Sequence, residues 1–145
     1  MMRKALLMTS ASLFLSVSLG VARAEAVPPC DPPAGIVSKP LGAATPAGLL
    51  AAVKKDLGDL AAPGEAFDAT DVVKTGRSRR LIFAWNQGTR WVLATEHGGR
   101  GYNNPILAYD VSADGAKATL VEKRIVFVPT YCATAKELLR LKTLI

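Results

Sequence analysis

The bulky apolar residues of this chain gather in four runs separated by turn-forming residues. Within the runs, large apolar residues alternate with small or polar ones at a period of two, the pattern of strands in a sheet. The turn residues between neighbouring runs predict the short connections of an antiparallel meander. The four runs span Arg80–Trp85, Arg90–Thr95, Pro105–Val111 and Lys117–Val128.

The first two runs predict a hairpin with a three-residue loop, Asn86-Gln87-Gly88, in which Gly88 takes the left-handed conformation. In that register Trp85 and Trp91 lie on the same face of the sheet, together with the other large residues. A two-residue Gln87-Gly88 turn is the alternative, and it mixes large and small residues on both faces. In the last run, the charged residues Glu122-Lys123-Arg124 indicate a bulge or an exposed edge.

A helical pattern precedes the strands. Thr45 is a good N-cap, and Pro46 suits the first helical position. The apolar residues that then recur at helical spacing are Leu49, Leu50, Val53, Leu57 and Leu60. Between this helix and the hairpin, a further short strand is possible at Asp71–Lys74.

A second, short helix is predicted near the C-terminus. Thr134 and Glu137 stand three apart, as in a capping box, and leucines follow. The order of helix, meander and helix predicts a single two-layer α+β domain at residues 46–145. Its four- to five-stranded antiparallel sheet would carry both helices on the large-residue face.

The N-terminus has the features of a cleaved signal peptide at residues 1–24. Arg3 and Lys4 supply the positive charge, residues 5–20 are apolar, and Ala22-Arg23-Ala24 offers the small-x-small cleavage pattern. An uncleaved membrane anchor is the alternative, but the apolar stretch is shorter than the ~20 residues needed to span a bilayer. We therefore expect a periplasmic or secreted protein with no membrane span after cleavage.

Residues 25–45 form a proline-rich arm that favours an extended conformation. The arm contains Cys30, and the one other cysteine is Cys132. Export permits a disulfide between them. Closing a loop of about 100 residues would stabilise the fold by about 4–5 kcal/mol in the chain-entropy model. The arm would then be strapped across the domain.

The net charge of the chain gives no support for nucleic acid as a partner. The whole chain has 18 Lys and Arg against 12 Asp and Glu, but three of the basic residues belong to the expected signal peptide. The remaining 15 against 12 give a net charge of +3, so the composition does not indicate a nucleic-acid-binding protein.

The most distinctive stretch is the loop Glu96–Asn104, with three glycines in four residues. Such a loop can turn its amides outward to form an anion-binding nest. The candidate binding side chains are His97, Arg100, Tyr102, Asn103 and Asn104, and the basic turn from Arg77 to Arg80 is a candidate flank for them. The alternative is a flexible connection in which Tyr102 packs onto the sheet.

Catalytic and metal chemistry have little support in the sequence. His97 is the single histidine, no known nucleophile motif is present, and we expect neither a metal nor another cofactor. The sequence thus predicts an exported, non-enzymatic binding or protein-interaction domain of the bacterial envelope. Its partner would be an envelope protein or a glycan ligand. The alternatives are a small envelope-polymer hydrolase that uses His97 and Glu96, and a structural envelope component.

Overall fold

The computed structural model describes residues 30–70, 76–127 and 130–141. The expected signal peptide and the possible strand at Asp71–Lys74 lie outside these residues. In the described part, one strand and one helix are followed by four strands and a final helix. These elements are β1 (Val37–Ser38), α1 (Ala47–Leu57), β2 (Arg79–Gln87), β3 (Arg90–His97), β4 (Asn104–Val111), β5 (Ala118–Val126) and α2 (Tyr131–Arg140).

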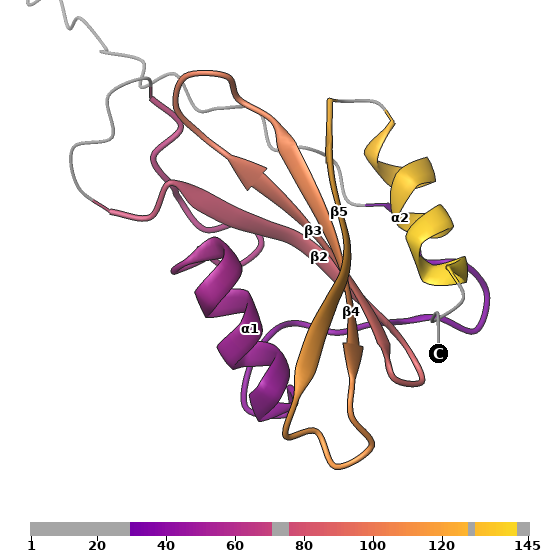
Figure 1. Cartoon of the computed structure of the whole chain (residues 1–145). Coiled ribbons are helices and arrows are strands. Elements are labelled where there is room, and N and C mark those ends of the chain that lie inside the picture. Colours follow the sequence, from indigo (N-terminus) through magenta and orange to yellow (C-terminus); the bar gives the residue numbers. More distant parts are fainter. Residues whose placement is uncertain (1–29, 71–75, 128–129, 142–145) are drawn as a thin grey trace, which may run out of the picture.

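The strands form one antiparallel sheet in the order β1-β2-β3-β4-β5 (Figure 1). This confirms the predicted α+β class, with its antiparallel meander, its N-terminal helix and its short C-terminal helix. The fifth strand comes from the arm, where Val37 pairs with Asn86 and Ser38 with Trp85 at the edge of β2. A short edge strand suits a proline-rich segment, because proline cannot donate a hydrogen bond inside a sheet.

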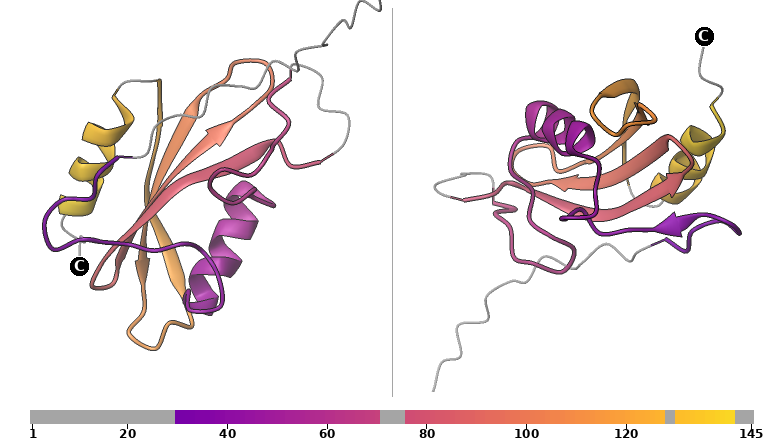
Figure 2. Two further views of the ribbon diagram at one scale, coloured as in Figure 1. Left: turned by 180° about the vertical axis from the view of Figure 1, so that it is seen from behind. Right: turned by 90° about the horizontal axis from the view of Figure 1, so that it is seen from below.

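The two helices cover opposite faces of the sheet, so the expected placement of both on one face is wrong. Helix α1 packs Leu49, Val53 and Leu57 against one face, and α2 packs Leu138 and Leu139 against the other. Figure 1 shows one helix on each side of the strands, and the view from behind in Figure 2 shows the same arrangement. The sheet therefore has a helix layer against each face, rather than the two layers expected. We call these the α1 face and the α2 face.

The two tryptophans are separated by the sheet, which corrects the predicted hairpin register. Trp85 belongs to the core of the α2 face, and Trp91 to the core of the α1 face. The turn consists of Gly88 and Thr89, with Gln87 opposite Arg90, so both considered registers are wrong. Gly88 does have the predicted positive φ, at 59°.

The turn at Gly88 and Thr89 separates the two tryptophans, and a bulge in β2 accounts for the second error of face, at Leu81. The pairing shifts between Leu81 and Phe83, so that Ile82 and Phe83 both contribute to the core of the α2 face. An extra residue breaks the period of two and exchanges the faces of all residues beyond it. In β5 both predicted alternatives occur: the pairing with β4 shifts between Ala108 and Tyr109, which places a bulge at Val121, next to the charged residues, and the strand forms an edge of the sheet.

Helix α1 begins one residue later than expected, and helix α2 begins earlier than expected. Helix α1 starts at Ala47, and Pro46 is its N-cap with an extended ψ of 132°. The hydroxyl of Thr45 does not cap the helix but accepts a hydrogen bond from the amide of Gly42. Helix α2 starts at Tyr131, so Thr134 lies inside it and its hydroxyl donates to the carbonyl of Thr130. The side chain of Tyr131, the first residue of the helix, is buried in the core of the α2 face.

The predicted disulfide between Cys30 and Cys132 is confirmed, with a Cα–Cα distance of 5.7 Å. It fastens the arm to the first turn of α2. From there the arm crosses the edge of the sheet and leads into α1 on the other face (Figures 1 and 2). The arm thus connects the two helix layers.

Candidate functional site

The loop between β3 and β4 closes as a hairpin. The amide of His97 donates to the carbonyl of Asn103 at 2.9 Å, and the amide of Asn103 donates back to the carbonyl of His97 at 3.3 Å. Residues 98–102 lie beyond this pair. Arg100, Gly101 and Tyr102 are exposed, and we call these three residues the loop tip.

The first half of the loop is held against the segment at Asp68 and Ala69. The amide of Gly98 donates to the carbonyl of Ser78, and the amide of Gly99 to that of Ala69. A Cβ on Gly98 would collide with the carbonyl oxygen of Asp68. Glycine is therefore required here for close packing. The idea that the glycine amides point outward as an anion nest is wrong for these two, because both donate within the protein.

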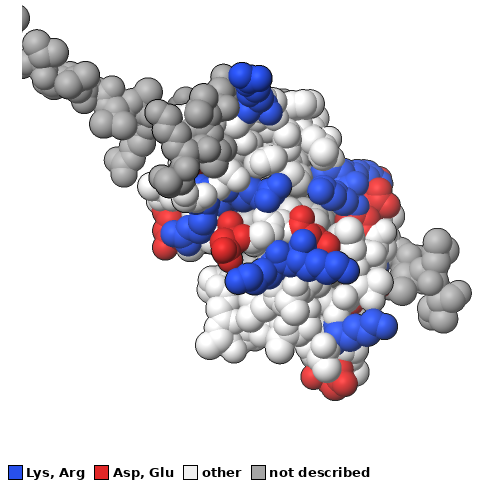
Figure 3. Space-filling model, turned by 60° about the vertical axis from the view of Figure 1, so that its left-hand side comes forward, with Lys and Arg blue, Asp and Glu red and all other residues white. Residues whose placement is uncertain are grey.

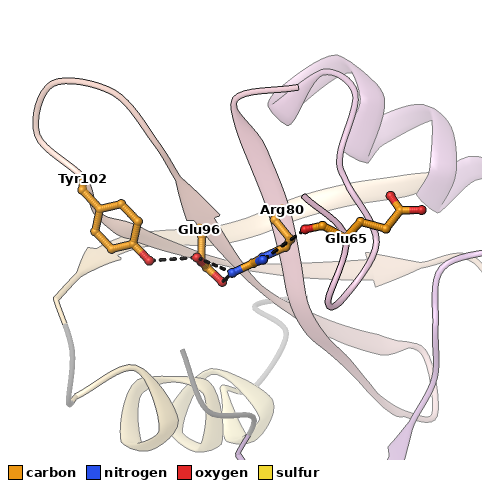
Figure 4. A network of polar contacts seen from close by, with 4 residues as sticks. All are labelled: Glu65, Arg80, Glu96 and Tyr102. Atoms are coloured by element: carbon orange, nitrogen blue, oxygen red, sulfur yellow. Dashed lines mark hydrogen bonds and ion pairs between the residues drawn. The ribbon is translucent and has the colours of Figure 1, made fainter. Parts of the chain in front are cut away.

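The second half of the loop is held by a buried network (Figure 4). The Tyr102 hydroxyl donates to Oε2 of Glu96 at 2.8 Å. Glu96 accepts two further hydrogen bonds from Nη2 of Arg80, at 2.9 and 3.1 Å. The Arg80 guanidinium also donates to the carbonyl of Glu65 and lies 4.5 Å from the ring centroid of Phe67. We call Arg80, Glu96 and Tyr102 the anchor network.

Burial makes the anchor network energetically important. The side chain of Arg80 is 9% exposed and that of Glu96 is 2% exposed. Two charges at this depth are tolerated because each is paired and hydrogen-bonded, and removing one would leave the other uncompensated. Tyr102 is the member that reaches the surface, with 37% of the residue exposed. The loop tip is therefore connected to the interior through one phenol.

The pKa values of two tyrosines respond to this network. Partial burial, followed by the hydrogen bond to Glu96, raises the pKa of Tyr102 to about 12. Burial also raises the pKa of Tyr131, to which the negative charge of Glu96 contributes. Both phenols are thus neutral at ordinary pH, and the Tyr102 hydroxyl keeps its proton to donate.

Asn104 lies inside the protein. Continuing the His97–Asn103 register places it opposite Glu96, and its exposed fraction is 0%. Its buried side-chain amide interacts with the Tyr102 hydroxyl and acts to lower the pKa of that group, against the larger effects that raise it. Asn103 donates from Nδ2 to the carbonyl of Gly101 at 2.6 Å. Of the five predicted binding residues, only Arg100 and Tyr102 therefore present their side chains at the tip.

His97 and Glu96 point to opposite faces of the sheet, as neighbours on a strand do. Glu96 bonds Arg80 and Tyr102 on the α2 face. On the α1 face, burial and the charges of Arg79 and Lys123 lower the pKa of His97. The arrangement does not support these two residues as an acid and base acting on one substrate.

The arginines of the predicted basic turn are used within the fold. Arg77 pairs with Glu65 at 3.1 Å, Arg79 donates to the carbonyl of Leu57 at 2.6 Å, and Arg80 belongs to the anchor network. Figure 3 shows positive and negative side chains intermingled on one face of the molecule, not a continuous basic field. Within the described residues, Arg100 has no ion pair or hydrogen bond through its side chain, so it is the cation available at the loop tip.

The sequence pattern did not reveal the anchor network, because it depends on the β2–β3 register. Arg80 stands opposite Glu96, whereas the expected register shifts the strands by two positions. The one available signal was the presence of opposite charges at the same end of two neighbouring strands.

A shallow groove of about 440 Å³ runs between α1 and β5, away from the loop, and small residues such as Gly48, Ala51 and Ala118 line it. Within residues 30–70, 76–127 and 130–141, no three His, Cys, Asp or Glu side chains gather in a way that could hold a metal ion. In the same residues, neither helix is long and apolar enough to cross a membrane. We found no family model that matches the chain and no similar protein among curated sequences or solved structures.

Proposed function

We propose that this protein is an exported, non-enzymatic binding domain of the bacterial envelope, and that it presents the loop tip Arg100 to Tyr102 to a partner. The observation that carries the proposal is the contrast between the exposed loop tip and the fixed halves of the loop beneath it. The tip is exposed, while both halves of the loop beneath it are fixed, by Gly98 on one side and by Tyr102 on the other.

Fixing a loop before binding favours affinity, because less conformational entropy is lost when the partner arrives. The composition of the tip points in the same direction. Arginine and tyrosine are enriched among the residues that dominate binding energy at interfaces. Arg100 offers a bidentate contact to a carboxylate or phosphate, and the exposed part of the Tyr102 ring offers a surface for stacking on a sugar or packing on a protein.

A periplasmic or secreted location is part of the proposal. The sequence of residues 1–24 supports export. The disulfide between Cys30 and Cys132 supports an oxidising compartment, because cytosolic thiols are kept reduced. The partner would be another envelope protein or a glycan ligand.

The proposal is tested by comparing variants in binding assays. We would immobilise wild-type protein, Arg100→Ala and Tyr102→Ala, and quantify the proteins captured from envelope extract and the binding of soluble muropeptides. Lys136→Ala is the matched control, since it removes an exposed positive charge from α2, distant from the loop in sequence. We expect both tip variants to lose a partner that the control retains. If all four proteins capture the same partners with the same affinity, the tip is not the binding surface.

A further inference from the structure

The outer edge of β5 is the largest unpaired edge in the described part of the sheet. The opposite edge is covered in part by the arm strand β1, whereas β5 pairs only with β4. An open edge strand offers its free backbone groups to another strand, and proteins limit this with bulges and charges. In β5 these devices are confined to part of the strand: the bulge lies at Val121, and the charges are Glu122, Lys123 and Arg124.

Beyond the bulge, β5 also carries exposed apolar side chains. Ile125 is 59% exposed, and Phe127, one residue past the strand, is 65% exposed. By the alternation of a strand, Lys123, Ile125 and Phe127 share one face. This is the α1 face, because Ile125 pairs with Pro105, two residues before the α1-face residue Leu107. Helix α1 meets β5 near its other end, at Ala118 and Leu120.

The charges on the α2 side of β5 are already satisfied within the chain. Arg124 pairs with Glu122 at 3.5 Å and with Glu137 of α2 at 2.9 Å. On the α1 side, Lys123 has no ion pair within the described residues. The surface therefore consists of two exposed apolar residues and one uncompensated ammonium group. A second copy of the same surface complements it.

We propose that two copies of this protein associate through the C-terminal half of β5, in an antiparallel pairing whose two-fold axis passes between the two Ile125 residues. Two-fold symmetry requires that residue pairs across the axis have a constant sum of numbers. With the axis at Ile125, each Phe127 lies opposite Lys123 of the second copy, and each Arg124 lies opposite Val126.

This register is favoured by charge and by the side chains it buries. Axes at Glu122, Lys123 or Arg124 would each set two like charges directly opposite, which destabilises a strand pair. The axis at Ile125 avoids this. It covers the two most exposed large apolar residues of the described chain and brings an ammonium group to a ring, as in a cation–π contact. It also begins beyond the bulge, so that five residues of each strand, 123–127, can pair.

The register can be tested by cysteine cross-linking of the otherwise complete protein. A cysteine at the axis lies opposite the same cysteine of the second molecule, so Ile125→Cys should form an intermolecular disulfide under mild oxidation. Leu120→Cys is the matched control, because Leu120 is also exposed on the α1 side of β5 but lies five residues from the axis. We expect the Ile125→Cys dimer to form at least about tenfold faster. Equal rates, or fastest cross-linking at Lys123→Cys or Val126→Cys, would overturn the proposed register.

Association itself is measured on protein without added cysteines. Sedimentation equilibrium of the wild type should show a reversible dimer, and Phe127→Glu should weaken it by at least about tenfold, since loss of a central interface aromatic commonly has that effect. Phe127 is exposed, so this variant keeps the core intact. A wild-type protein that remains monomeric up to about 1 mM would overturn the proposal. The loop-tip variants serve as a separate control, because they should dimerise normally whether or not they bind a partner.

Discussion

The two faces of the sheet hold their helices by different means. On the α1 face the contacts are mainly aliphatic, with hydrogen bonds to the helix that include one from the Tyr109 hydroxyl to Asp56 at 2.9 Å. On the α2 face the disulfide of Cys132 fastens one end of the helix. Near the other end, Arg90 pairs with Asp110 and donates to the carbonyl of Leu138. The α2 face is therefore the more strongly cross-linked half of the molecule.

This difference shows where the loop tip obtains its support. The anchor network lies on the α2 face, because Arg80 and Glu96 point that way and Tyr102 reaches them from the loop. On the α1 face, an arginine also contacts the end of the helix, since Arg79 donates to the carbonyl of Leu57. That contact fixes the helix but not the loop. Changes on the α2 face should therefore reach the binding surface, while equivalent changes on the α1 face should not.

The largest effect is expected from the disulfide. Replacing both Cys30 and Cys132 by alanine should lower the free energy of unfolding by about 4–5 kcal/mol in the chain-entropy model, because the bond closes a long loop. Urea denaturation of the wild type and the double variant measures this. A loss below about 1 kcal/mol would mean that the arm contributes little to holding α2 in place.

Breaking the buried ion pair comes next. Glu96→Ala leaves the Arg80 charge buried without compensation and should cost about 3–5 kcal/mol. Asp56→Ala is the control on the α1 face, where the Tyr109 hydroxyl, an uncharged donor, loses its hydrogen bond and the cost should be smaller, about 1–3 kcal/mol. Arg80→Met combined with Glu96→Leu should recover most of the stability lost in Glu96→Ala. Equal losses for Glu96→Ala and Asp56→Ala would remove the distinction between the faces.

Tyr102→Phe tests the connection between the network and the surface. The ring remains but the hydrogen bond to Glu96 is lost, so we expect a stability loss of about 1 kcal/mol. Amide hydrogen exchange should become faster at the loop tip and remain unchanged in α1. Unchanged exchange at Gly101 would show that the phenol does not hold the loop.

The smallest effect concerns the titration of His97. Its folded-state pKa is lowered, so His97 contributes stability above its unfolded pKa, and this contribution is lost as the pH falls through the folded pKa. Lys123→Gln removes a positive charge from the same face and should raise the pKa of His97 in an NMR titration. Glu122→Gln, on the α2 side of the strand, should change that pKa less. A larger change in the pKa of His97 from Glu122→Gln than from Lys123→Gln would contradict the assignment of His97 to the α1 face.

Much of the fold could be predicted from the sequence, because it depends on local patterns. Turn residues separated the four long strands, and two cysteines allowed only one pairing. The assignment of faces failed because β2 and β3 are apolar on both sides, as expected for strands between two helix layers. The bulge at Ile82 and Phe83 has no clear sequence signal, and it decides which residues meet.

For the candidate site, the sequence located the loop but not its support. Arg100 and Tyr102 were identified from residue type and a glycine-rich context. The burial of Asn104 and the pairing of Arg80 with Glu96 follow from the register of three strands, which residue types alone do not determine. The sequence indicated a positively charged turn, whereas the structure shows that its arginines form contacts with other groups of the same chain.

The most direct test of the account is the mobility of the loop tip in the free wild-type protein, measured by backbone amide nitrogen relaxation at Arg100, Gly101 and Tyr102. If the anchor network fixes the loop before binding, the order parameters should be close to the value of about 0.85 typical of rigid backbone. Values below about 0.6 at these residues would contradict the claim that the protein presents a preformed binding surface.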